Sequence, residues 1–233
     1  MSLTKYHYPE KMTVKKFLPV IHVLNLKQML RNIATSKSNG ADGVFLINHG
    51  FMSSKELIAL YDKAVETYPD FWIGINCLDL SGYEVFQNVP EHVHGIWVDD
   101  GGVDDESRMY AKLISSSRKR SPFQGMYFGG VAFKGQCPVE NVRRLAKKAT
   151  KYMDVITTSG PMTGTSASVD KIFSMKEAIG ERSLALASGV TVDNVESYLP
   201  YVDYFLVATG ISINFYELDP LKVMNLSRKI HDW

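Results

Sequence analysis

The sequence is poor in the features that identify several classes of protein. Its 233 residues include only two cysteines, Cys77 and Cys137, too few for a disulfide framework or a paired-cysteine metal motif. The formal net charge is +1, so the chain has no excess charge to attract nucleic acid or an anionic lipid surface. We therefore expect free thiols, a reducing compartment and no nucleic-acid partner.

Long hydrophobic runs are also missing. No apolar stretch approaches the roughly 18 residues that a membrane-spanning helix needs. The first residues, Met-Ser-Leu-Thr-Lys-Tyr-His, lack the apolar core of a signal peptide. We expect a cytoplasmic protein without a membrane span.

Standard cofactor and nucleophile motifs are absent as well. There is no P-loop, no nucleophile elbow and no zincin helix, so we predict no cofactor. His22, His49 and Asp99 are of ligand type, but they have no compact spacing that indicates a metal site.

What the sequence contains is a regular alternation along the whole chain. Short apolar runs typical of buried parallel strands alternate with stretches of helical periodicity. The hydrophobic content of 45% and the charged content of 22% are those of a globular protein. We predict the α/β class and a single (β/α)₈ (TIM) barrel over residues 1–233, with residues 1–16 as an N-terminal cap segment. An open, doubly wound sheet is the alternative, because it has the same local pattern. The eight strand-like runs, each followed by a helix-like run, are 17–23, 43–49, 71–76, 95–100, 126–133, 155–160, 184–187 and 204–208.

Two glycine turns follow the last two strand-like runs, Ser188-Gly189 and Thr209-Gly210. In a TIM barrel the loops after the seventh and eighth strands often bind phosphate, because glycine lets backbone N–H groups approach an anion. A third glycine-rich loop, 159–165, precedes them. The predicted phosphate-binding or ligand-binding residues are Gly160, Thr163, Gly164, Ser188, Gly189, Thr209 and Gly210.

Polar residues follow the other strand-like runs, and in a barrel these ends share one face. Histidine titrates nearest neutrality, and a carboxylate in a partly dry pocket is suited to general acid or base chemistry. Side-chain alternation allows only one of Asp99 and Asp100 to face the mouth. Lys134 is a candidate for Schiff-base chemistry or anion contact. Packed histidines, helix-capping carboxylates and a solvated lysine are the structural alternatives. The predicted catalytic candidates are Asp99, Asp100, His49, His22 and Lys134, and the predicted ligand-orienting residues are Asn48 and Asn76.

The last third of the chain also resembles a known family. The segments 158–164, 187–194 and 207–211, with Asp219-Pro220 before the last helix-like run, look like the C-terminal half of the BtpA-type (BtpA/SgcQ) family. The resemblance implies a (β/α)₈ barrel with a phosphate-type site at its mouth. The family takes its name from a photosystem I biogenesis factor, and other members occur among sugar-metabolism proteins. The chain departs from the family pattern at 25–28 and at Ile47-Asn48. The glycine turns are similar, more generally, to those of ribulose-phosphate-binding barrels, which implies a sugar or prenyl phosphate.

These observations predict an enzyme of the isomerase, epimerase or lyase type. Its ligand is expected to be a small phosphorylated metabolite, a sugar phosphate or a nucleotide-derived phosphate, held by the loops after the seventh and eighth strands. The alternative is a non-catalytic barrel, a BtpA-like assembly or stability factor. Whether the barrel forms a homo-oligomer is left open.

Overall fold

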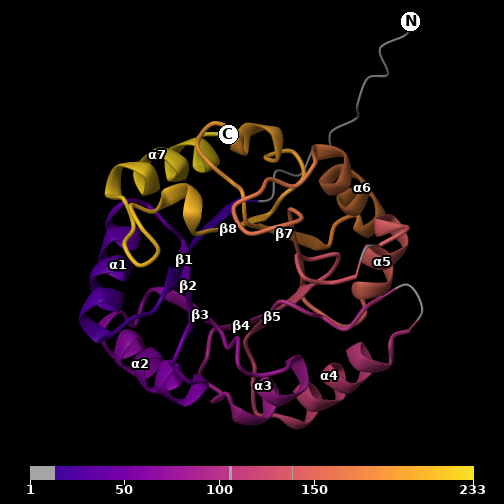
Figure 1. Ribbon diagram of the computed structural model, residues 1–233, viewed down its shortest axis with the longest axis horizontal. Helices are drawn as coiled ribbons and strands as arrows, with labels where there is room; N and C mark the ends of the chain where they lie inside the picture. The colour runs from indigo at the N-terminus through magenta and orange to yellow at the C-terminus, as the bar shows by residue number, and fades with distance from the viewer. Residues whose placement is uncertain (1–13, 105–106, 138) are drawn as a thin grey trace, which may run out of the picture.

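Eight parallel strands close into a barrel in the computed structural model, which describes residues 14–104, 107–137 and 139–233. Each strand pairs with the next in sequence, and β1 pairs with β8 (Figure 1). The predicted TIM barrel is confirmed. Residues 1–13 of the predicted cap lie outside the described residues. The strands are β1 (Lys16–His22), β2 (Gly43–Ile47), β3 (Trp72–Asn76), β4 (Gly95–Val98), β5 (Met126–Gly130), β6 (Val155–Ser159), β7 (Ser183–Ala187) and β8 (Tyr204–Val207).

Helices surround the barrel (Figure 1), and local side chains fix where several of them begin. The Ser53 side chain accepts a hydrogen bond from the N–H of Glu56, and the Glu56 side chain accepts one from the N–H of Ser53. At the last helix, Asp219 caps the N-terminus and Pro220 occupies the first turn. The helices are α1 (Leu26–Ser38), α2 (Ser54–Thr67), α3 (Gly82–Asn88), α4 (Met109–Arg120), α5 (Val142–Ala149), α6 (Val169–Ile179) and α7 (Pro220–His231).

The prediction of a helix between β7 and β8 is wrong, because a 3₁₀ turn, η1 (Val195–Ser197), lies there instead. Asn194 binds the preceding loop, because its side-chain oxygen accepts from the N–H of Thr191 and its amide donates to the carbonyl of Gly189. Such local bonds compete with helix formation, and Pro200 a few residues later has no N–H to extend a helix. A second 3₁₀ turn, η2 (Thr209–Ile211), follows β8.

Three strands end two or three residues earlier than predicted, at Ile47, Val98 and Gly130. The predicted runs 43–49, 95–100 and 126–133 included the first residues of the following loops. His49, Asp99 and Asp100 are therefore loop residues, which lie just above the barrel rather than within its wall.

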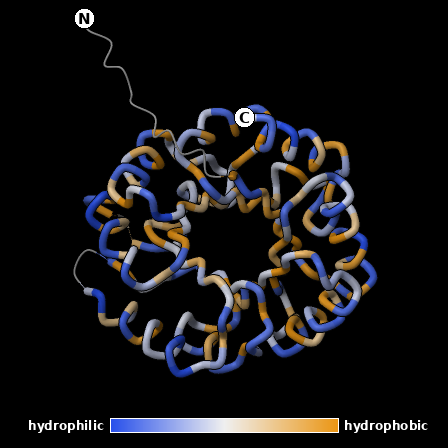
Figure 2. The backbone as a smooth tube through the Cα atoms, turned by 180° about the vertical axis from the view of Figure 1, so that it is seen from behind, coloured by the Kyte–Doolittle hydropathy of each residue, from blue (hydrophilic) through white to orange (hydrophobic). Residues whose placement is uncertain are grey.

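Large side chains pack the barrel interior. A buried cluster inside the barrel includes Phe45, Trp97 and Phe128, and a second cluster lies between strands and helices. A Cβ atom on Gly74 would lie 2.4 Å from the Phe45 ring, so glycine there leaves space for the aromatic side chain. Figure 2 shows the hydrophobic inner ring from behind. Because these side chains fill the interior, a ligand site is expected at the face where the strands end. No helix in the described part of the chain is long and apolar enough to cross a membrane.

Candidate functional site

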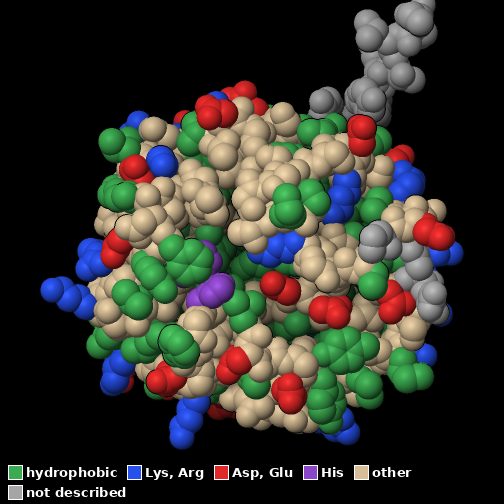
Figure 3. Space-filling model, in the orientation of Figure 1, with side chains coloured by type: hydrophobic (Ala, Val, Ile, Leu, Met, Phe, Trp, Pro, Cys, Tyr) green, Lys and Arg blue, Asp and Glu red, His purple; other side chains and the backbone are tan. Residues whose placement is uncertain are grey.

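Polar side chains gather at the end of the barrel where the strands finish. Figure 3 shows histidine, lysine and acidic side chains around the central hollow of this face. His22 ends β1 and Asn76 ends β3, while Asp99 follows β4 directly. His22 and Asp99 each lie two residues after a side chain of the interior cluster, Val20 and Trp97 respectively, so alternation turns both inward.

Asp99 is held in a partly buried position. The Asn76 side-chain amide donates to Asp99 Oδ1 at 3.0 Å, and Asn76 itself is buried. Burial raises the pKa of Asp99, against the smaller lowering effects of the Asn76 hydrogen bond and the Lys134 charge. A carboxyl group with a raised pKa is suited to general acid or base work. Asp99 and Lys134 also line a cavity of about 630 Å³ on the β4 and β5 side of the mouth.

Asp100 has a different environment, as side-chain alternation predicts. It is exposed, and its Oδ1 accepts hydrogen bonds from the N–H of Gly102 at 2.9 Å and from Gln136 Nε2 at 2.7 Å. These bonds tie the loop after β4 to the loop after β5. Asp100 lines the same cavity as Asp99, whereas alternation turns only Asp99 toward the barrel axis; the catalytic role of either carboxylate stays a prediction.

His22 and His49 lie together with Phe215, a residue that the sequence did not single out. The Phe215 ring stacks on His22 with centroids 4.1 Å apart, and His49 meets both rings edge-on. His22 Nδ1 lies 3.1 Å from the Phe215 carbonyl oxygen. Because a carbonyl oxygen only accepts hydrogen bonds, Nδ1 must carry the proton to donate this one. Burial lowers the pKa of His22; the Phe215 hydrogen bond raises it, and the nearby His49 and Lys134 lower it further. A neutral His22 with this tautomer presents Nε2 as a proton acceptor.

The glycine turns after β7 and β8 lie against each other, as the predicted phosphate site requires. A Cβ atom on Gly210 would lie 2.0 Å from the carbonyl oxygen of Val190. A Cβ atom on Gly189, whose φ is +71°, would lie 2.4 Å from the nitrogen of Ser166. The loops after β6, β7 and β8 thus pack backbone to backbone, and no side chain fits at these two positions.

Several backbone N–H groups of these turns have no partner. Within the described residues, the N–H groups of Gly189, Thr209 and Gly210 donate no hydrogen bond. The Gly189 carbonyl, by contrast, accepts from Ser166 Oγ at 2.9 Å and from Asn194 Nδ2 at 2.8 Å. The sequence had not indicated this role of Ser166 and Asn194, which fixes the orientation of the peptide. Unpaired N–H groups on adjoining turns are what an anion site provides.

Lys134 connects the cavity beside Asp99 to the glycine-rich loop after β6. Its Nζ donates to Thr163 Oγ1 at 3.1 Å, and its backbone N–H donates to Ser159 Oγ at 2.8 Å. In the same loop, Gly164 lies near the turn after β8, because a Cβ atom added to it would lie 4.0 Å from Thr209 Cγ2. Lys134, Thr163, Gly164 and Thr209 therefore form a continuous edge of the mouth.

Asn48 does not share the orientation of Asn76. Its side-chain oxygen accepts from the N–H of Leu78 at 2.7 Å, and its amide donates to the Met52 carbonyl and to Asp79 Oδ1. The side chain is buried, and these three bonds join the loops after β2 and β3. The Asn48 side chain is thus bonded to these loops, and its ligand-orienting role stays a prediction.

Lys171 is a second lysine near the mouth that strand-end analysis missed, because it lies in the first turn of α6. Its Nζ donates to the carbonyl oxygens of Ala132 at 2.6 Å and Ser159 at 2.7 Å. Burial lowers the pKa of Lys171 to about 8. The side chain links the ends of β5 and β6, next to Lys134.

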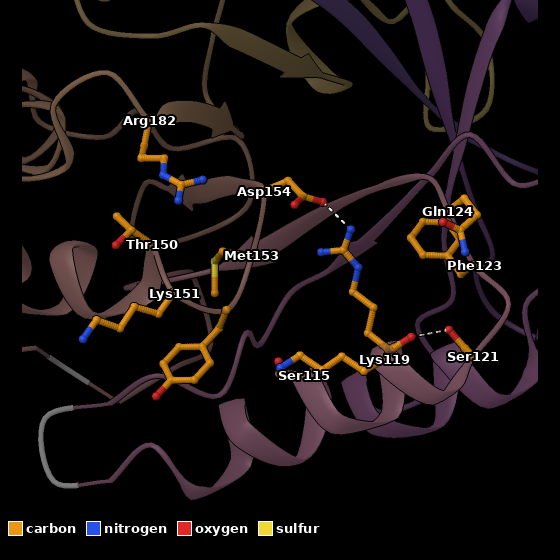
Figure 4. A pocket seen from close by; sticks show the side chains of 12 residues that line it. Ser115, Lys119, Ser121, Phe123, Gln124, Thr150, Lys151, Met153, Asp154 and Arg182 are labelled. Carbon is orange, nitrogen blue, oxygen red and sulfur yellow. Dashed lines mark hydrogen bonds and ion pairs between the residues drawn. The ribbon is translucent and has the colours of Figure 1, made fainter.

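A second cavity, of about 460 Å³, lies at the opposite end of the barrel (Figure 4). Its lining includes Gln124, Asp154 and Arg182, which precede β5, β6 and β7. Arg118, in the last turn of α4, binds Asp154 at 2.6 Å. Basic residues there also complement the negative end of the helix dipole. This end of a TIM barrel serves stability, so the cavity is not part of the candidate site.

Within the described residues, we find no disulfide and no cluster of metal-ligating side chains. Cys77 is buried and Cys137 is exposed, and both are free. In residues 14–104, 107–137 and 139–233, no group of three or more His, Cys, Asp or Glu side chains is placed to hold a metal ion.

Comparisons with known proteins agree with the fold. No protein-family model matches the chain, and no curated protein matches its sequence. Phosphoribosyl anthranilate isomerase from Thermus thermophilus is similar at 13% identity, over 93% of this chain and 98% of that one, with a TM-score of 0.62. The KDPG aldolase from Legionella pneumophila is similar at 12% identity, over 94% of each chain, with a TM-score of 0.64.

A third solved structure is (S)-3-O-geranylgeranylglyceryl phosphate synthase from Thermoplasma acidophilum in complex with sn-glycerol-1-phosphate. It has 10% identity over 94% of each chain and a TM-score of 0.66. At these identities the likeness concerns the fold, and the resemblance to the BtpA-type family stays a prediction. The chain is a TIM barrel, similar in fold to these three solved structures.

Proposed function

We propose that this barrel is an enzyme that acts on a small phosphorylated metabolite. The observation that carries the proposal is the set of unpaired N–H groups of Gly189, Thr209 and Gly210 on two turns that pack together. A phosphate dianion needs several donors at once, and backbone N–H groups on adjoining turns provide them without a side-chain charge. The similar folds of an isomerase of a phosphoribosyl compound and of a synthase bound to glycerol phosphate add support.

Proton transfer is the chemistry that the rest of the mouth favours. His22 presents Nε2 as a base, since its Nδ1 proton is directed to the Phe215 carbonyl. Asp99, with a raised pKa, is the corresponding acid or base on the other side of the mouth. The Lys134 ammonium is placed to stabilise negative charge that develops on a substrate oxygen. Isomerase, epimerase and lyase reactions all use such an arrangement.

Binding of inorganic phosphate tests this proposal without knowledge of the substrate. At ten times its Kd, a ligand that binds only the folded state adds about 1.4 kcal/mol of stability and raises the Tm of a chain of this size by about 3–6 °C. We expect a rise of this size for the wild type. The variant Thr209→Glu places a negative charge on an exposed residue of the turn after β8 and should abolish the rise.

The control is Ser116→Glu, which adds the same charge on the exposed face of α4 and should retain the rise. A wild type that millimolar phosphate does not stabilise would contradict the proposal and favour the non-catalytic assembly factor. Retention of the full rise in Thr209→Glu would place phosphate elsewhere.

A further inference from the structure

One side of the mouth is apolar and borders the glycine turns. The loops after β8, β1 and β2 expose Ile213, Leu24 and Phe51, and Phe215 is 49% exposed. Because β8, β1 and β2 are consecutive in the barrel, these side chains lie over one sector of the mouth. The turn at Thr209 follows β8 as well, so this sector adjoins the proposed phosphate site. Large apolar side chains that gather at an exposed site indicate a binding surface.

Phe215 is held in a fixed position. It lies in a hairpin, residues 212–218, closed by an antiparallel bridge. The carbonyl oxygen of the next residue, Tyr216, accepts hydrogen bonds from Gln28 Nε2 at 2.6 Å and from Asn32 Nδ2 at 2.7 Å. Both donors are buried residues of α1. The helix therefore fixes the hairpin before any ligand arrives, which reduces the entropy that binding costs.

The rings of Phe215, His22 and His49 form an aromatic corner. Phe215 and His22 stack at 4.1 Å with an interplanar angle of 13°, and His49 is edge-on to them at 5.1 Å and 5.6 Å. Phe215 is half exposed and His49 is exposed, so the corner is accessible from solvent. A further ring extends such a cluster by offset stacking or an edge-to-face contact. A hydroxyl-rich group would instead lose hydrogen bonds to water against Phe215, without compensation.

We propose that the ligand of this site is a phosphate monoester whose organic part carries an aromatic ring. The ring packs on the corner of Phe215, His22 and His49, while the turns after β7 and β8 bind the phosphate. This inference rests on the proposed function, since it uses the phosphate site as its anchor.

The test uses the full chain and four probes in calorimetric titrations: phenyl phosphate, butyl phosphate, glycerol phosphate and inorganic phosphate. We expect phenyl phosphate to bind about tenfold more tightly than the other three, the size of one good aromatic contact. Phe215→Leu keeps an apolar side chain but removes the ring. It should reduce the affinity for phenyl phosphate to that for butyl phosphate and leave inorganic phosphate unchanged. Phe173→Leu, the same change on α6, is the control.

Each outcome has a distinct meaning. If inorganic phosphate itself does not bind, the proposed function fails and this inference fails with it. If inorganic phosphate binds but phenyl phosphate binds no more tightly than glycerol phosphate, the aromatic ligand is refuted and the phosphate site stands. Equal affinity for butyl and phenyl phosphate, or an unchanged preference in Phe215→Leu, would also refute the aromatic ligand.

Discussion

Replacement of Gly210 by alanine tests the close packing of the two glycine turns. The added Cβ atom would lie 2.0 Å from the carbonyl oxygen of Val190, whereas real Cβ contacts essentially never fall below 3.0 Å. The two turns must separate by about 1 Å to admit it, because the contact is with backbone. Such overpacking costs about 1–3 kcal/mol, which lowers the Tm of a chain of this size by about 2–12 °C.

Separation of the turns should also weaken phosphate binding, since the donors of Gly189 and Gly210 would no longer converge. Gly50→Ala is the matched control. Gly50 has a φ of +65°, and no atom lies within 4 Å of a Cβ added there. The Gly50→Ala substitution should therefore cost about 1–2 kcal/mol of backbone strain and leave phosphate binding unchanged. Thermal unfolding with and without inorganic phosphate measures both effects. A Gly210→Ala protein with wild-type Tm and wild-type phosphate stabilisation would refute the reasoning.

Two further predictions concern the ionisable groups of the mouth. Because the pKa of Asp99 is raised in the folded state, its contribution to stability falls as the pH rises above 3.8, the value at which the free side chain titrates. Asp99→Asn should therefore be at least as stable as the wild type at pH 7 but lose activity; a large loss of stability at pH 7 would argue against burial as the cause. The pKa of Lys171 is lowered to about 8 from 10.5, so the unfolded chain binds more protons between these values and stability should rise with pH across that window. Urea unfolding at several pH values should show this rise in the wild type and not in Lys171→Met, and an identical pH dependence in both proteins would contradict it.

The sequence predicted the barrel because its signals are local and repeated. Each strand is a short apolar run and each helix has a periodic face, so eight repeats of the same pattern leave few topologies. The strand ends were harder to predict. Asp99 follows its apolar run directly and His49 follows one after Asn48, and only backbone pairing shows where the wall of the barrel stops.

The site was only partly predictable for a different reason. Asp99, His22 and Lys134 could be placed at the mouth in advance because topology brings strand ends together; their catalytic roles stay predictions. Asn48 has the same position in the pattern as Asn76, but its side chain is used by neighbouring loops. Phe215 and Lys171 escaped because they come from a hairpin and a helix, and no spacing rule connects them to the mouth.

We propose that phosphate binds the N–H groups of the turns after β7 and β8. Two-dimensional ¹H–¹⁵N spectra recorded during titration with inorganic phosphate test it residue by residue. We expect the amide signals of Gly189, Thr209 and Gly210 to shift most and to saturate together. Unchanged signals for these three residues, or larger shifts around Arg182 at the opposite end of the barrel, would contradict it.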